Sequence, residues 1–222
     1  MPRFAAGVVR FKNSIYPEKQ DLFEELSKGQ SPEALFIACS DSRVETAMIT
    51  QTEPGELFIC RNAGNIVPPH TESTGGMTAS IEYAVAVLKV PHIVVCGHTE
   101  CGAMKGAMNP EGLEGLPHVA KWLGYSKAAV DIVDGIAEDD ASPDERMKML
   151  IEQNVLLQLQ HLRTHPSVAA ALAKGTTELH GWVYDIRSGE VEAWDEAEGK
   201  FITIDSRYAA QIRELAGDHT CA

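Results

Sequence analysis

The chain is organised around two stretches, ALFIACSDSR at residues 34–43 and IVVCGHTECG at residues 93–102. Each begins with a short apolar run and ends in small and polar residues. Runs this short and this apolar are typical of strands that are buried on both faces, as in parallel sheets. The polar ends would then follow the carboxyl ends of neighbouring strands, which is where ligands bind in open α/β sheets.

Three side chains at these strand ends are typical zinc ligands. Cys39 follows the first apolar run, and His98 and Cys101 follow the second. Two thiolates and an imidazole suit Zn²⁺, and three protein ligands leave a fourth position for water, as in catalytic zinc sites. We therefore predict one Zn²⁺ per chain, bound by Cys39, His98 and Cys101.

Asp41 leaves a second interpretation open. As a fourth ligand it would close the site, and a permanently closed site would be structural rather than catalytic. Arg43 favours the open site, because its guanidinium can hold the Asp41 carboxylate in a bidentate pair. Held in this way, Asp41 can also accept a hydrogen bond from the zinc-bound water and orient it.

Length and composition are those of one globular α/β domain. The chain has 222 residues, of which 44% are hydrophobic and 23% are charged. The formal net charge of −13 argues against nucleic acid and against an anionic membrane as partners. No apolar run reaches the length of a membrane span, and the N-terminus lacks the pattern of a secretory signal, so we expect a cytoplasmic protein.

The remaining cysteines and histidines are not spaced in the sequence as metal ligands usually are. An odd number of cysteines at irregular spacing is not a disulfide framework. We expect Cys60 and Cys96 to be buried in strands, and Cys221 lies next to the end of the chain. We expect ordinary surface or interior positions for the other histidines, which are His70, His92, His118, His161, His165 and His180.

The order of apolar segments predicts a central, mostly parallel sheet with flanking helices. The expected parallel strands are 34–38, 56–60 and 92–96. The segments at 179–186, 190–194 and 201–204 are expected to form the C-terminal edge extension, a strand that pairs with a hairpin and is antiparallel in part. The expected helices are 17–29, 44–50, 77–89, 102–107, 117–137 with a break near Gly124, 143–163 and a short one from Pro166. We divide this single domain, 1–222, into an N-terminal helical arm (1–33), an α/β core (34–205) and a tail (206–222).

The motifs resemble those of the β-class carbonic anhydrases over roughly residues 15–205. The pattern C-x-D-x-R at 39–43 and H-x-x-C at 98–101 is accompanied by EPGELF at 53–58, RNAGN at 61–65, SIEYA at 80–84 and GAM at 102–104. The resemblance implies a zinc lyase that converts CO₂ and water to bicarbonate and a proton. It also implies a homodimer or a higher even oligomer, in which N-terminal helices embrace a neighbouring subunit.

The same resemblance implies roles for individual residues. Asp41 and Arg43 would gate and orient the metal-bound water, with Asp41 as the fourth ligand in a closed state. The substrate pocket would be lined by Gln30, Phe58, Ala63, Tyr83 and Gly102. Phe36 occupies a position where one branch of the family has a Trp of an inhibitory bicarbonate site, so we do not expect that regulation.

Two alternative functions remain open at this point. The same scaffold could hydrolyse small linear sulfur compounds, COS or CS₂, because such electrophiles differ little from CO₂ in shape. The protein could also be a non-catalytic, zinc-stabilised scaffold that binds bicarbonate. A rate assay with both kinds of substrate separates these alternatives from CO₂ hydration.

Overall fold

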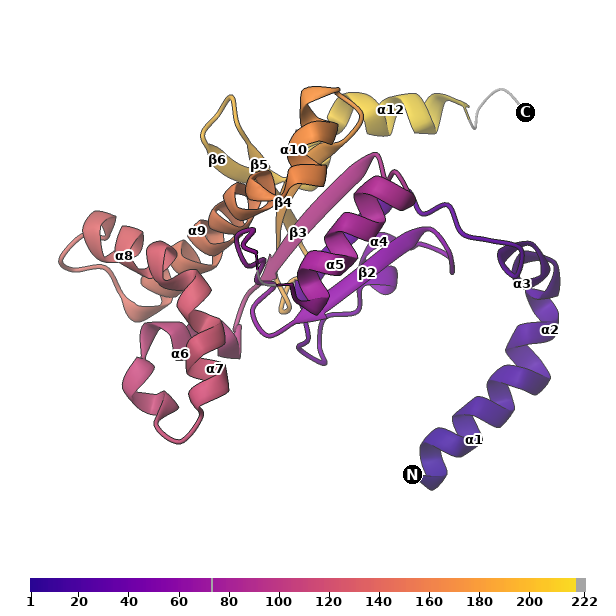
Figure 1. Cartoon of the computed structure of the whole chain (residues 1–222), viewed down its shortest axis with the longest axis horizontal. Helices are drawn as coiled ribbons and strands as arrows, with labels where there is room; N and C mark the ends of the chain where they lie inside the picture. Colours follow the sequence, from indigo (N-terminus) through magenta and orange to yellow (C-terminus); the bar gives the residue numbers. More distant parts are fainter. Residues whose placement is uncertain (73, 219–222) are drawn as a thin grey trace.

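A six-stranded sheet forms the centre of the computed structural model, which describes residues 1–72 and 74–218 (Figure 1). Ser73 and residues 219–222, and with them Cys221, lie outside the described residues. The strands are β1 (Ala34–Cys39), β2 (Leu57–Asn62), β3 (His92–His98), β4 (Glu178–Tyr184), β5 (Val191–Asp195) and β6 (Lys200–Thr203). Their order in the sheet is β2-β1-β3-β4-β5-β6. The first four strands are parallel, and β5 and β6 add an antiparallel edge, which confirms the predicted fold class.

The strands extend further toward the polar stretches than the sequence predicts. β1 includes Cys39 and β3 includes His98, although their predicted ends were residues 38 and 96. The strands are longer because the parallel hydrogen bonding continues past the predicted ends. The backbone N–H of Ser40 donates to the Asn62 carbonyl at 2.8 Å, and that of Thr99 donates to the Tyr184 carbonyl at 2.9 Å. β2 is likewise displaced by one to two residues from the predicted 56–60.

The larger part of the core lies between one face of the sheet and several helices. These helices are α5 (Gly76–Glu82) with its continuation η2 (Tyr83–Val87), α8 (Lys127–Ile136), α9 (Pro143–Thr164) and α10 (Pro166–Ala173). α9 approaches β3 closely, because a Cβ atom added at Gly97 would lie 2.9 Å from the Cγ2 of Val155. The glycine beside His98 is therefore required by the close packing of helix and strand.

The opposite face of the sheet has a smaller core. Phe36, Val94 and Cys96 pack there against Trp182 and Tyr184 from β4. The short helix α4 (Thr46–Thr50) lies where a helical turn was predicted, and it adds Ile49 to this face. Cys96 is buried here, and Cys60 is buried on the other face, as the sequence predicts for both.

The remaining helices connect and flank the strands. They are α6 (Gly102–Met108), η3 (Pro110–Leu113), α7 (Pro117–Leu123), η4 (Gly124–Ser126), α11 (Ile204–Arg207) and α12 (Ala209–Asp218). The break predicted near Gly124 is confirmed by the short 3₁₀ turn η4. Within the described ranges no helix combines the length and the apolar composition needed to cross a membrane.

The N-terminal arm is more helical than predicted. It consists of α1 (Pro2–Arg10), η1 (Phe11–Ile15), α2 (Tyr16–Glu18) and α3 (Gln20–Leu26), so the predicted single helix at 17–29 is wrong in its bounds. Lys19, at φ −119° and ψ 20°, interrupts the helical path between α2 and α3. The arm extends away from the sheet (Figure 1), and every side chain from residue 1 to 18 is exposed.

Candidate metal centre

Two strand ends and one helix start bring three ligand side chains together. Cys39 and His98 are the last residues of β1 and β3, and Cys101 directly precedes α6. The two sulfur atoms and a ring nitrogen of His98 lie within 4.8 Å of one another, and all three residues are buried. The neighbouring positions of β1 and β3 in the sheet, and the short turn to α6, produce this arrangement as predicted from the sequence.

His98 has one ring nitrogen that is ready to bind a cation. Its Nδ1 lies 2.8 Å from the Thr99 carbonyl, and because a carbonyl can only accept, Nδ1 carries the hydrogen. Nε2 is therefore a lone-pair acceptor, and within the described residues this buried atom has no hydrogen-bond partner. An unpaired buried acceptor is costly. Zinc would satisfy it, and the donor set of one nitrogen and two sulfurs fits zinc.

The two thiols differ in how readily they ionise. Contact with the Cys101 thiol, together with the Gly64 N–H at 3.3 Å, lowers the pKa of Cys39. The same contact and burial raise the pKa of Cys101, although the N–H groups of Ala103 and Met104 at the start of α6 oppose the increase. A thiolate at Cys39, and N–H groups that favour ionisation of Cys101, make both sulfurs available to a cation.

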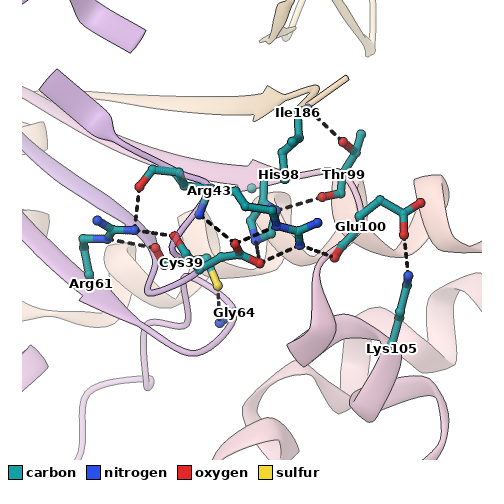
Figure 2. A network of polar contacts seen from close by, with 12 residues as sticks. Cys39, Arg43, Arg61, Gly64, His98, Thr99, Glu100, Lys105 and Ile186 are labelled. Carbon is teal, nitrogen blue, oxygen red and sulfur yellow. Dashed lines mark hydrogen bonds and ion pairs between the residues drawn. The ribbon is translucent and has the colours of Figure 1, made fainter. Parts of the chain in front are cut away.

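Asp41 and Arg43 form the bidentate pair that the sequence suggests. Arg43 Nε donates to Oδ1 at 2.9 Å and Nη2 donates to Oδ2 at 2.7 Å, and this pairing holds the pKa of Asp41 far below its ordinary value. Oδ2 remains 3.9 Å from His98 Nε2. Arg43 Nη2 also donates to the Glu100 carbonyl at 3.0 Å, which connects the loops after β1 and β3 (Figure 2).

Arg61 supports the loop after β1, a role that sequence reasoning missed. Its Nε donates to the Cys39 carbonyl at 3.0 Å, and its Nη2 donates to the carbonyls of Asp41 at 2.7 Å and Val44 at 2.6 Å (Figure 2). Arg61 lies on β2, one residue before the partner of Cys39 in the parallel register. The sequence signals are the position of a basic residue at the end of a neighbouring strand and its place at the start of the RNAGN motif.

A buried polar network fixes the loop that contacts Cys39. Gly64 has a φ of +84°, and its N–H donates to the sulfur of Cys39. Its carbonyl accepts from Asn154 Nδ2 on α9 at 3.1 Å. Asn154 Oδ1 in turn accepts from Ser126 Oγ and from Gln158 Nε2, each at 2.8 Å. α9 thus positions a hydrogen-bond donor to a candidate metal ligand, Cys39, which sequence reasoning also missed.

Within a single chain, the five residues assigned to the substrate pocket do not all lie at the same place. Ala63 precedes Gly64, and Gly102 follows Cys101, so both adjoin the metal centre. Phe58 and Tyr83 contact each other, with ring centroids 6.0 Å apart. Phe58 lies four residues before the partner of Cys39 in β2, which is about 13 Å along the strand. Gln30 is exposed in the segment before β1, at the end of that strand opposite Cys39.

Comparisons with known proteins agree with this arrangement. A family model described as carbonic anhydrase matches residues 34–191. A carbonic anhydrase of Pseudomonas aeruginosa is 49% identical over 212 residues, which cover 96% of this chain and 94% of that protein. The solved structure of the β-carbonic anhydrase CcaA has a TM-score of 0.88 at 42% identity and covers 91% of this chain and 98% of its own. A structure from Sordaria macrospora, reported among two tetrameric β-carbonic anhydrases, has a TM-score of 0.72 at 32% identity and covers 86% and 94%. A match of this extent, together with the ligand geometry, shows that the chain belongs to the β-carbonic anhydrase family of lyases.

Proposed function

We propose that the protein catalyses the reversible hydration of CO₂ to bicarbonate and a proton, with one zinc ion bound by Cys39, His98 and Cys101. The observation that carries the proposal is the buried, unpaired Nε2 of His98 beside two thiol sulfurs. Zinc would lower the pKa of a water molecule and so supply the nucleophile near neutral pH. The protein residues hold the ion, orient the nucleophile and bind the substrate.

Arg43 keeps Asp41 available as an acceptor. Both carboxylate oxygens of Asp41 accept from Arg43, so the carboxylate stays ionised. In this open arrangement Asp41 can accept a hydrogen bond from the nucleophilic water and keep the lone pair of its oxygen directed toward CO₂. If Asp41 left Arg43 and became the fourth zinc ligand, it would exclude water and close the site.

Two variants test the role of this pair. Arg43→Ala should lower kcat while one zinc per chain is retained, because Asp41 loses the partner that holds it in place. Asp41→Ala should also retain zinc and lose most of the activity. Full activity in Arg43→Ala with normal zinc content would contradict the gating role of Arg43.

The substrate pocket requires a second copy of the chain. Gln30, Phe58 and Tyr83 lie away from their own metal centre, and the arm leaves apolar side chains such as Phe4 (69% exposed) and Val8 (67% exposed) uncovered. An even oligomer would cover this arm and bring those three side chains to a neighbouring centre. The relatives from S. macrospora are described as tetrameric. A monomeric mass by light scattering at micromolar concentration would contradict this proposal.

Stopped-flow measurement of CO₂ hydration on protein of known zinc content tests the function directly. We expect rapid hydration, and a rate no higher than the uncatalysed one would leave a bicarbonate-binding scaffold as the better explanation. Hydrolysis of COS or CS₂ is measured on the same sample, and faster turnover of these compounds than of CO₂ would overturn the substrate assignment. Cytoplasmic location is also proposed, and the free thiols of Cys39, Cys60, Cys96 and Cys101 are consistent with a reducing compartment.

A further inference from the structure

Three potential metal ligands gather at the end of the sheet opposite the zinc ligands. His92 is the first residue of β3 and pairs in register with Glu178, the first residue of β4. His180 lies two residues after Glu178 and therefore on the same face of β4. His92 Nδ1 lies 3.1 Å from His180 Nε2, which lies 3.9 Å from an oxygen of Glu178. The three ligand atoms lie within 4.8 Å of one another.

These separations match those of ligands around one ion. Nitrogen and oxygen ligands at zinc bond lengths of about 2.0–2.1 Å in a tetrahedron are about 3.4 Å apart. The distances of 3.1 and 3.9 Å lie on either side of this value. Two imidazoles and one carboxylate suit divalent zinc, cobalt and nickel. His92 and Glu178 are exposed, so an ion can enter from solvent.

The surroundings of His180 favour an unprotonated Nε2. Its Nδ1 lies 2.9 Å from the hydroxyl of Tyr208, between α11 and α12, and Trp182 Nε1 donates to the same hydroxyl at 3.3 Å. A Tyr208 oxygen that accepts from His180 Nδ1 leaves Nε2 unprotonated, which is the usual arrangement around a ligating histidine.

We propose that His92, Glu178 and His180 form a second binding site, for a divalent transition-metal cation, with Tyr208 as the residue that positions His180. The site is separate from the zinc centre, because His92 and His98 are at opposite ends of β3, about 20 Å apart. An ion there connects the first residues of β3 and β4 and, through Tyr208, the C-terminal helices. It therefore stabilises the fold without a part in CO₂ hydration.

Cobalt(II) is the probe that tests the site, because its absorption reveals its ligands. Zinc-loaded protein is freed of loosely bound metal on a chelating resin and equilibrated with CoCl₂, and bound cobalt is counted per chain. We expect one cobalt per chain without a thiolate-to-cobalt charge-transfer band, and a rise in Tm. Cobalt that entered the cysteine site would show that band. A failure of the zinc assignment can therefore be distinguished from a failure of this second site.

Three variants and one control decide whether these residues bind the ion. His92→Ala and Glu178→Gln change exposed side chains and should weaken cobalt binding at least tenfold. Tyr208→Phe should weaken it about 10–100-fold, as loss of an orienting partner does. His118→Ala, a change of an exposed histidine on α7, should bind as the unchanged protein does. The proposal would be overturned if the unchanged protein bound no cobalt without a thiolate charge-transfer band, or if His92→Ala and His118→Ala bound cobalt with equal affinity. Either result would leave only a hydrogen bond between two histidines.

Discussion

Replacement of Asn154 by alanine should destabilise the protein strongly. Asn154 is 1% exposed and makes three hydrogen bonds, one to the Gly64 carbonyl and one each from Ser126 and Gln158. A typical hydrogen bond contributes about 1 kcal/mol net, and a buried group left unpaired costs about 1–3 kcal/mol. Alanine leaves three such groups behind, so the loss should be at least about 3 kcal/mol. Water entering the space left by the amide should keep the loss below about 5 kcal/mol, above which single substitutions are exceptional.

Urea denaturation of the zinc-loaded protein measures this loss. Asn154→Ala should lower the unfolding midpoint with an unchanged m-value, because the same surface is exposed on unfolding. Asn109→Ala is the matched control, an exposed asparagine at the end of α6, and should change the free energy of unfolding by no more than about 0.5 kcal/mol. A loss below about 1 kcal/mol in Asn154→Ala would refute the reasoning, since the network would then contribute little to stability.

Three further predictions follow from packing, titration and loop support. Gly97→Ala should cost about 1–3 kcal/mol in urea denaturation, because its new methyl group meets α9, whereas Gly135→Ala meets nothing within 4 Å and should not destabilise. Burial lowers the pKa of His161 and of His165 below 6.5, so the folded state binds fewer protons than the unfolded state. The free energy of unfolding should therefore fall as the pH drops below about 6.5. A free energy of unfolding that stays constant or rises over this range would contradict the prediction. Arg61→Ala removes three hydrogen bonds to the loop after β1, so zinc should pass to a chelator faster than from the unchanged protein. An equal rate of zinc transfer would show that the loop keeps its conformation without Arg61.

The parts of the fold that depend on local sequence could be predicted. The two apolar runs that end in Cys39 and His98 form adjacent parallel strands, because each run is apolar throughout and polar residues follow it. The candidate metal ligands Cys39, His98 and Cys101 could be named for the same reason. The arm was recognised only in part, although Phe4, Val8, Phe11 and Ile15 repeat at helical spacing. Pro17 was interpreted as the start of a helix, but it occupies the first turn of the short segment α2 within a path that is already helical.

The supporting residues could not be predicted, because their partners are distant in the sequence. Asn154 contacts Gly64 across 90 positions, and His92 contacts His180 across 88. Asn154 and Gln158 do stand four residues apart within an otherwise apolar helix face, which indicates a buried polar contact without naming its partner. His92 and His180 meet only because β3 and β4 pair in one particular register. Such contacts follow from the sheet order, which no local pattern specifies.

The zinc content and CO₂ hydration rate of Cys101→Ser test the central claim most directly. In the proposed zinc site Cys101 supplies one of three ligand atoms, so the variant should lose most of its tightly bound zinc and most of its activity. Cys60→Ser is the matched control, a cysteine on β2 outside the ligand group, and it should keep both as long as it remains folded. Full zinc occupancy and an undiminished hydration rate in Cys101→Ser would contradict the assignment of Cys39, His98 and Cys101 as the catalytic zinc site.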